Sequence, residues 1–248
     1  ELIRFIIINY RNIMKVFQYP LLCVLLLLTI SCVYTDLNRD HYLLSPDESL
    51  SFTFHIDQQN ISYSLKKDGN ILIDQSQLGI LADQFEFADD LQIKNVSRSR
   101  KNKTWTQVWG EQKQITDHHN ELAIHVTSNS HDIQMIIRFR LFNDGLGFRY
   151  EIPEQKELNE FKILDEITEF NFSEDATSWW IPAYSYRRFE FLYANTLISE
   201  ISRDTYSKLV ENLNGPRLGP EAVHTPFTVQ RNDGICIAIH EANLTNYS

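Results

Sequence analysis

The chain has 248 residues, of which 43% are hydrophobic and 23% are charged, and its formal net charge is -10. This length and composition fit one globular domain of roughly 200 residues behind an N-terminal targeting segment. The acidic balance argues against a nucleic-acid partner, because binding to a phosphate backbone needs a basic surface.

The N-terminus has the pattern of a secretory signal. Met14 and Lys15 precede an apolar run over residues 21–28 and the segment Thr29-Ile30-Ser31-Cys32. Small residues before the cysteine favour cleavage and attachment of a lipid at Cys32, as in bacterial lipoproteins. A plain signal peptide is the alternative. An uncleaved anchor is the third choice, because the apolar run is short for a membrane span.

These features predict the boundaries and the location of the protein. We interpret residues 1–13 as translated upstream sequence, 14–32 as the signal, 33–43 as a linker and 44–248 as the folded domain. The predicted location is the periplasm or the outer membrane of a Gram-negative bacterium, with membrane attachment through a lipid on Cys32. Cys236 is then the one cysteine of the mature domain, so no disulfide framework is possible. Its apolar neighbours predict a small buried residue.

The first part of the domain has the alternation of β-strands. Apolar and polar residues alternate over 50–56 and again over 61–65, and residues 71–73 form a third apolar run. Polar turns separate the runs, and Gly69 supplies a residue for which a positive φ is inexpensive. The pattern predicts a three-stranded meander. The basic cluster over 98–103 is interpreted as a solvated loop.

The middle of the chain repeats the alternation more strongly. Strands are predicted over 122–126, 133–141 and 146–152, and Asn143-Asp144-Gly145 is a hairpin turn between the last two. Arginines of these strands and Glu151 are expected to pair across the open face of the sheet. The polar segment 117–121 is interpreted as a turn. Its adjacent His118 and His119 point to opposite sides of an extended chain, which argues against one shared metal ion.

The last third carries weaker patterns. Residues 161–172 are compatible with a strand, 179–182 with a short buried strand, and 192–213 with a helix inserted between strands. Two final strands are predicted over 225–230 and 235–240. Many short strands without alternating helices indicate an all-β sandwich.

An ordered series of motifs resembles the N-terminal domain of glycoside hydrolase family 97. The resemblance covers residues 44–248, and the motifs are Trp105-Thr106-Gln107-Val108-Trp109-Gly110-Glu111, His119-Asn120-Glu121-Leu122, Arg138-Phe139-Arg140-Leu141-Phe142-Asn143-Asp144-Gly145, Phe148-Arg149-Tyr150, Asp165-Glu166-Ile167-Thr168-Glu169-Phe170, Thr225-Pro226 and Ile239-His240-Glu241-Ala242. Each motif is weak alone, but their order is specific.

The resemblance implies a fold and an activity. Family members have a β-super-sandwich of galactose-mutarotase type, followed by a catalytic (β/α)8 barrel and a small C-terminal β domain. They act on α-glucosides or α-galactosides with calcium at the active site, by either an inverting or a retaining mechanism. The catalytic carboxylates belong to the barrel, which this sequence lacks, so no catalytic residue is assigned.

One site residue follows from the resemblance. The N-terminal domain of the family contributes a glutamate to the calcium shell, and Glu241 is the matching position. Calcium takes six to eight hard oxygen ligands and accepts one from a neighbouring domain. The other interpretation of Glu241 is an exposed glutamate at the end of a strand.

Aromatic residues suggest a second kind of function. The residues that could stack on sugar rings are Trp105, Trp109, Trp179, Trp180, Tyr184, Tyr186 and Tyr193, although most aromatic residues of an all-β domain are buried. Two hypotheses therefore remain open. The first is the non-catalytic N-terminal domain of an exported glycoside hydrolase, and the second is a self-standing carbohydrate-binding or scaffold module on the cell surface.

Overall fold

The computed structural model describes residues 37, 39–57, 60–88, 90–128, 130, 132–156, 158–183, 191–209 and 222–241. The chain divides into two compact units, Glu1–Leu37 and Asn38–Ser248, and the second unit is the subject here. The predicted signal over 14–32, with Cys32, lies outside the described residues. In the described part of the chain, no helix has the length and apolar character needed to cross a membrane.

The first sheet is the predicted meander with one strand added in front. Its strands are antiparallel and follow the chain in order: β1 (His41–Leu44), β2 (Leu50–Asp57), β3 (Asn60–Lys67) and β4 (Asn70–Gln77). The turn between β3 and β4 has positive φ at Asp68 (48°) and Gly69 (83°). Two consecutive positive φ values match the twist of a two-residue hairpin. The predicted turn is confirmed.

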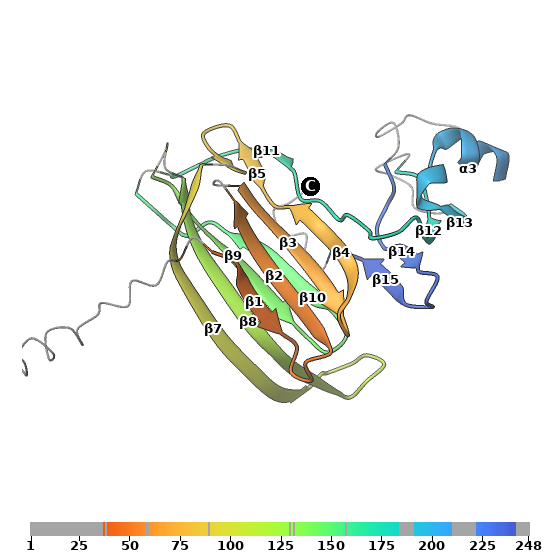
Figure 1. Cartoon of the computed structure of the whole chain (residues 1–248), viewed down its shortest axis with the longest axis horizontal. Coiled ribbons are helices and arrows are strands. Elements are labelled where there is room, and N and C mark those ends of the chain that lie inside the picture. The colour runs from red at the N-terminus through yellow and green to blue at the C-terminus, as the bar shows by residue number, and fades with distance from the viewer. Residues whose placement is uncertain are drawn as a thin grey trace, which may run out of the picture. The chain divides into compact units, whose positions relative to one another are not determined.

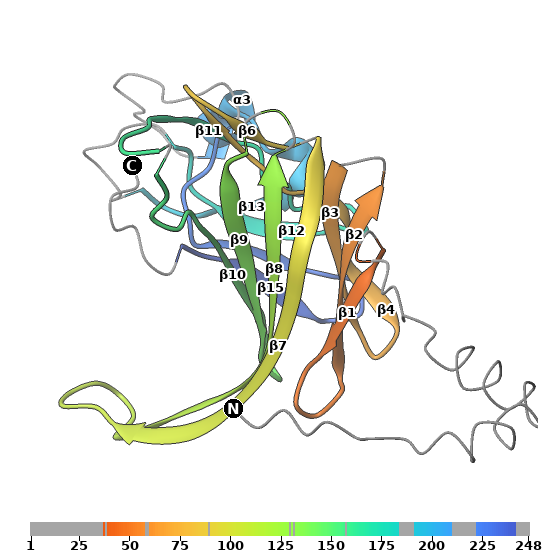
Figure 2. The ribbon, with the colours of Figure 1, turned by 90° about the vertical axis from the view of Figure 1, so that its left-hand side faces the viewer.

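The second sheet contains the longest strands of the chain. Its order is β10-β9-β8-β7, with β7 (Leu91–Thr106), β8 (Gln114–Ser128), β9 (Gln134–Leu141) and β10 (Leu146–Glu151), all antiparallel. The predicted hairpin of β9 and β10 is confirmed. The two four-stranded sheets lie face to face (Figures 1 and 2). A smaller sheet joins β11 (Ile163–Glu166), β5 (Ile80–Ala82) and β6 (Glu86–Phe87).

Aromatic side chains fill the space between the two large sheets. Phe52 and Phe54 on β2 and Phe139 on β9 are fully buried. The ring centroids of Phe52 and Phe139 are 4.5 Å apart, and those of Phe54 and Phe139 are 6.0 Å apart. Burial of such rings is the main favourable term in folding this domain. The all-β sandwich predicted from the sequence is confirmed.

A separate four-stranded sheet follows, in the order β13-β12-β14-β15. It contains β12 (Thr177–Trp180), β13 (Ala194–Leu197), β14 (Phe227–Gln230) and β15 (Cys236–Ile239). The helix predicted over 192–213 is only partly correct. Residues 194–197 form a strand, a 3-10 turn spans Ile198–Glu200, and the helix α3 covers Arg203–Leu209. Residues 210–213 lie outside the described residues.

Two polar segments predicted as loop and turn belong to long strands. Residues 98–103 lie in β7 and residues 117–121 in β8, and the two segments pair with each other. The charged residues are compatible with strands because they can form ion pairs between β7 and β8. Lys101 Nζ lies 2.6 Å from Asp117 Oδ2. His118 is exposed and His119 is buried, so the two histidines do point to opposite sides.

The outer face of the second sheet carries the expected ion pairs. Arg138 binds the carboxylates of Glu151 and Glu121, at N···O distances of 2.7 Å each. Arg140 Nε donates to the second oxygen of Glu121 at 2.8 Å, and Arg149 Nη2 lies 2.5 Å from Glu151. The hydrogen bond from Arg138 holds the pKa of Glu151 at about 2, against the opposing effect of burial. The pairing of Glu151 is confirmed, and Glu121 is an additional partner.

Replacing Phe139 tests the aromatic core. Phe139→Ala removes a fully buried ring that contacts both neighbouring phenylalanines, so the free energy of unfolding should fall by about 3–5 kcal/mol. Urea denaturation followed by circular dichroism measures the change. Leu164→Ala, at a side chain that is 55% exposed, is the control and should change stability by less than about 0.5 kcal/mol. Equal effects of the two substitutions would contradict the assignment of the core.

The ion pairs predict a loss of stability in acid. The folded-state pKa of Glu151 lies below the ordinary value of 4.5, so its contribution is complete above about pH 4.5 and is lost as the pH falls towards 2. Glu151→Gln should lower stability at pH 7 by about 1–2 kcal/mol after allowance for solvent screening. It should also flatten the pH dependence between those limits. The exposed Glu154 provides the control Glu154→Gln, and a parallel pH profile for both variants would refute this account.

Candidate functional site

The hairpin of β14 and β15 positions the predicted metal ligand. Its register pairs Gln230 with Cys236 and Phe227 with Ile239. The turn between the strands is closed by Arg231, whose N–H donates to the carbonyl of Ile235 at 2.9 Å. Gly234 adopts a φ of 86° in this turn, a conformation that glycine enters without steric cost.

Continuing this register beyond the last pair places Thr225 opposite Glu241. Both residues lie two positions outside the Phe227–Ile239 pair. The Thr225 hydroxyl donates a hydrogen bond to Oε2 of Glu241. The Glu241 side chain is exposed, so its remaining carboxylate lone pairs face solvent. The Thr225 hydroxyl thus orients one carboxylate just beyond the end of the hairpin.

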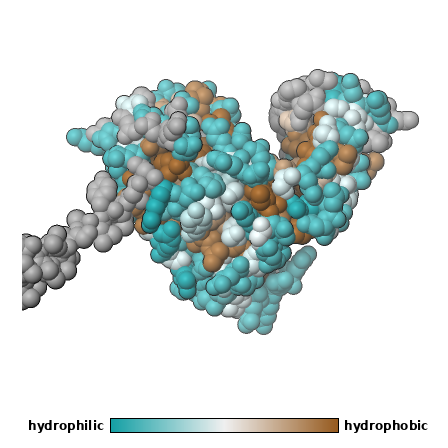
Figure 3. Space-filling model, in the orientation of Figure 1, coloured by the Kyte–Doolittle hydropathy of each residue, from teal (hydrophilic) through white to brown (hydrophobic). Residues whose placement is uncertain are grey.

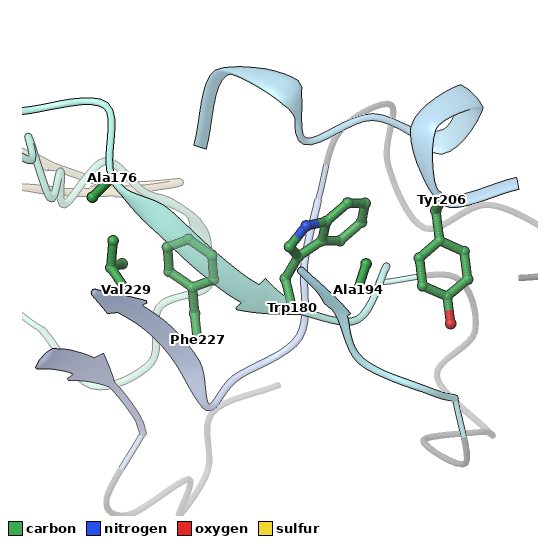
Figure 4. Packing of buried hydrophobic residues seen from close by; sticks show 6 residues of the cluster. All are labelled: Ala176, Trp180, Ala194, Tyr206, Phe227 and Val229. Carbon is green, nitrogen blue, oxygen red and sulfur yellow. The ribbon is translucent and has the colours of Figure 1, made fainter. Parts of the chain in front are cut away.

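The hairpin is anchored by a small hydrophobic cluster. The cluster consists of Ala176, Trp180, Ala194, Tyr206, Phe227 and Val229 (Figure 4). Ile239 of β15 packs against it. The ring centroids of Trp180 and Tyr206 are 5.5 Å apart, and Trp180 Nε1 donates to Thr196 Oγ1 at 3.0 Å. The anchor fixes the strand that leads directly to Glu241.

A histidine lies near the carboxylate. The N–H of His224 donates to the carbonyl of Ile181 at 3.0 Å, which ties the start of the hairpin to the chain that follows β12. Burial lowers the pKa of the His224 imidazole below 6.5, and the negative charge of Glu241 opposes this shift. The two side chains therefore interact electrostatically.

The described residues fit one ligand of a calcium site and not a whole site. No group of three or more His, Cys, Asp or Glu side chains able to hold a metal occurs in the described part of the chain. Calcium needs six to eight oxygen ligands. Glu241 supplies a hard carboxylate oxygen of the right kind, in an exposed position.

Cys236 is exposed, and the prediction of a buried core residue is wrong. The error comes from its neighbours. The residues of β15 alternate, and the half-buried positions are Ile237 and Ile239. Cys236 lies in the same strand but on the other face. A run of apolar residues marks the strand, whereas the burial of each residue depends on which face the register turns inward.

The predicted sugar-stacking residues divide into two groups. Trp180 is 1% exposed and belongs to the hydrophobic cluster, and Trp179 is half-buried. Trp109 is 86% exposed, Trp105 52% and Tyr193 49%. Tyr184 and Tyr186 lie outside the described residues. Only the exposed members of the described set are available to a ligand in this structure.

Sequence reasoning did not assign Thr225 and His224 to the site. Thr225 belongs to one of the motifs noted in the sequence, but no role was given to it. Its role becomes visible only in the structure, through the hydrogen bond from its hydroxyl to Glu241. For His224 the sequence contains no signal, because its place depends on the contact with Ile181.

The fold places the chain in the class of antiparallel β-sandwich domains. Residues 43–248 match the family model described as "Glycosyl-hydrolase 97 N-terminal". The chain belongs to this family. The resemblance drawn from the sequence motifs is confirmed over nearly the same range.

Relatives with known activities are longer than this chain. A retaining alpha-galactosidase of Bacteroides thetaiotaomicron is 22% identical over 237 residues, which cover 94% of this chain and 32% of that protein. A glycoside hydrolase family 97 enzyme of Pseudoalteromonas sp. strain K8, solved in complex with panose, is 32% identical with a TM-score of 0.71. That match covers 84% of this chain and 29% of the enzyme.

A more distant structure shares the fold alone. A beta-arabinopyranosidase is 18% identical with a TM-score of 0.62, over 77% of this chain and 29% of that one. In all three comparisons the chain spans about a third of the relative's length.

Proposed function

We propose that this chain is the non-catalytic N-terminal domain of an exported, calcium-dependent enzyme that hydrolyses α-glucosides or α-galactosides. Membership of the family and the match to one third of longer hydrolases support this assignment. The observation that carries it is the single oriented carboxylate of Glu241, held by Thr225 at the end of the last described hairpin.

Glu241 is proposed as one ligand of a calcium ion whose other ligands come from the (β/α)8 catalytic barrel. A bound calcium ion would polarise or orient the sugar, and it would also join the two domains. The domain's own contributions are to orient the Glu241 carboxylate through Thr225 and to hold the strand end through the hydrophobic cluster. Export, with a lipid on Cys32, is the proposed setting for such an enzyme because its oligosaccharide substrates lie outside the cytoplasm.

The second candidate function is a self-standing carbohydrate-binding or scaffold module. The exposed rings of Trp105 and Trp109 favour it. A hydrolase domain and a binding module differ in what the exposed carboxylate does, because a binding module has no need for calcium at Glu241.

Without a barrel the chain should not hydrolyse glycosides. We expect the 248-residue protein to release no nitrophenol above the blank from 4-nitrophenyl α-glucoside or α-galactoside, since glycoside hydrolysis needs a pair of placed carboxylates. The measurement is absorbance over many hours at high protein concentration, with and without calcium. Turnover that persists through successive purification steps would overturn the assignment as a non-catalytic domain.

Glu241→Gln tests the calcium ligand in an enzyme in which this domain is joined to its catalytic domain. Loss of one carboxylate should raise the calcium dissociation constant about tenfold or more. Isothermal titration and the calcium dependence of the melting temperature measure this independently of activity. The exposed Glu86 provides the matched control Glu86→Gln, which should leave the titration unchanged. An unchanged titration for Glu241→Gln would remove this residue from the calcium shell.

A further inference from the structure

The strands β7 and β8 continue beyond the sheet as a two-stranded arm. β8 pairs with β9 only from Asn120 to Thr127, whereas its pairing with β7 continues to the Thr106–Gln114 pair. In the described part of the chain, residues 101–106 and 114–119 therefore pair as strands with each other alone. Figure 2 shows the arm curving away from the other strands of its sheet and ending in a loop. A two-stranded ribbon by itself buries little apolar surface and is marginally stable in water.

Large apolar side chains are concentrated at the tip of this arm. Trp109 is 86% exposed, Val108 98% and Trp105 52%. Neither tryptophan contacts another aromatic ring among the described residues. The face of the molecule seen in Figure 3 is mostly hydrophilic, with separate hydrophobic patches. A tryptophan buried in the core would stabilise the fold, and these two are not buried there. Their exposure together at one tip therefore indicates a binding surface.

The loop that carries Trp109 is braced from within. The N–H of Gln107 donates to the carbonyl of Lys113 at 3.1 Å. The Gln107 side-chain amide donates to the carbonyl of Gln112. Gly110 has a φ of 143°, and an added Cβ there would collide with the Gln107 side chain. The loop is thus closed by its own hydrogen bonds and presents Trp109 without help from a partner.

The chemistry around the two rings favours a neutral sugar. Of the fifteen residues 102–116, seven have amide or hydroxyl side chains and three are charged. The aliphatic side chains in this segment are Val108 and Ile115 alone. A protein-binding surface has a larger apolar centre, and an anion site needs more positive charge. Flat rings surrounded by uncharged hydrogen-bonding groups match a pyranose, which has apolar C–H faces and a hydroxyl edge.

We propose that the tip of the β7–β8 arm is an oligosaccharide-binding site in which Trp105 and Trp109 stack on sugar rings. The ligand class is a neutral oligosaccharide of α-linked hexoses, and this part of the inference rests on the proposed function. The site is separate from Glu241, which lies on the β14–β15 hairpin. It would hold a chain of sugar units near the enzyme and take no part in bond cleavage.

The test uses the 248-residue protein with maltoheptaose and, separately, stachyose as probes. Isothermal titration should show binding of at least one of them. Trp105→Ala and Trp109→Ala should each raise its dissociation constant about tenfold or more. Tyr42→Ala is the matched control, since this aromatic side chain is 63% exposed but lies on β1, and it should bind like the unchanged protein. Circular dichroism establishes that each variant folds.

Three results would overturn the arm site. The first is the absence of binding to both sugars by the folded protein, and the second is equal binding by the two tryptophan variants and the Tyr42→Ala control. The third is a tryptophan variant that loses self-association, measured by analytical ultracentrifugation, but binds sugar like the unchanged protein. That result would identify the tip as a contact between copies. Glu241→Gln should leave sugar binding at the arm unchanged, so failure of the arm site and failure of the calcium assignment are distinguishable.

Discussion

The contact of Phe139 with Phe52 and Phe54 joins the two large sheets, and the register of both sheets follows from it. A one-residue shift of β9 would turn Phe139 out to solvent and bring its charged neighbours inward. The same alternation that buries Phe139 places Arg138 and Arg140 on the outer face. There the two arginines form ion pairs with Glu121 on β8. The aromatic core and the outer ion pairs therefore depend on the same register of β9. A change of that register would remove both.

A side-chain hydrogen bond fixes the geometry just beyond the last described hairpin. Outside the Phe227–Ile239 pair, the Thr225 hydroxyl donates to Glu241, and the cluster around Trp180 keeps β14 in place. Holding a carboxylate by one hydroxyl leaves it oriented but still able to bind a cation. A glutamate at the free end of an unpaired segment would have to be ordered when the ion binds, at a cost in entropy. In the proposed calcium site, the hydrogen bond from Thr225 would reduce that cost.

Much of the sandwich could be predicted from the sequence because its strands bury one face. Alternation identified β2, β3, β9 and β10, and turn residues located the loops between them. The prediction failed where the sequence of a strand is polar on both faces. Residues 98–103 and 117–121 are polar on both sides, so periodicity could not distinguish the arm from a loop. It also failed for Cys236, whose exposure depends on the orientation of an edge strand. Glu241 is a candidate from a family resemblance, and its hydrogen-bond partner Thr225 became apparent only from the structure.

The sequence prediction missed the arm because the arm buries little apolar surface. Most strands of this domain are explained by what they bury within it, but the outer part of β7 and β8 buries little. This outer part is held together by cross-strand pairs, such as the ion pair of Lys101 with Asp117, and by the loop that Gln107 closes. A segment that the core does not require, and that nevertheless displays two tryptophans, has to be explained by something outside the core. The arm and Glu241 lie on different sheets and offer different chemistry, an apolar stacking surface in one case and a single charged ligand in the other. The two proposed roles, sugar binding at the arm and calcium ligation at Glu241, therefore rest on separate residues.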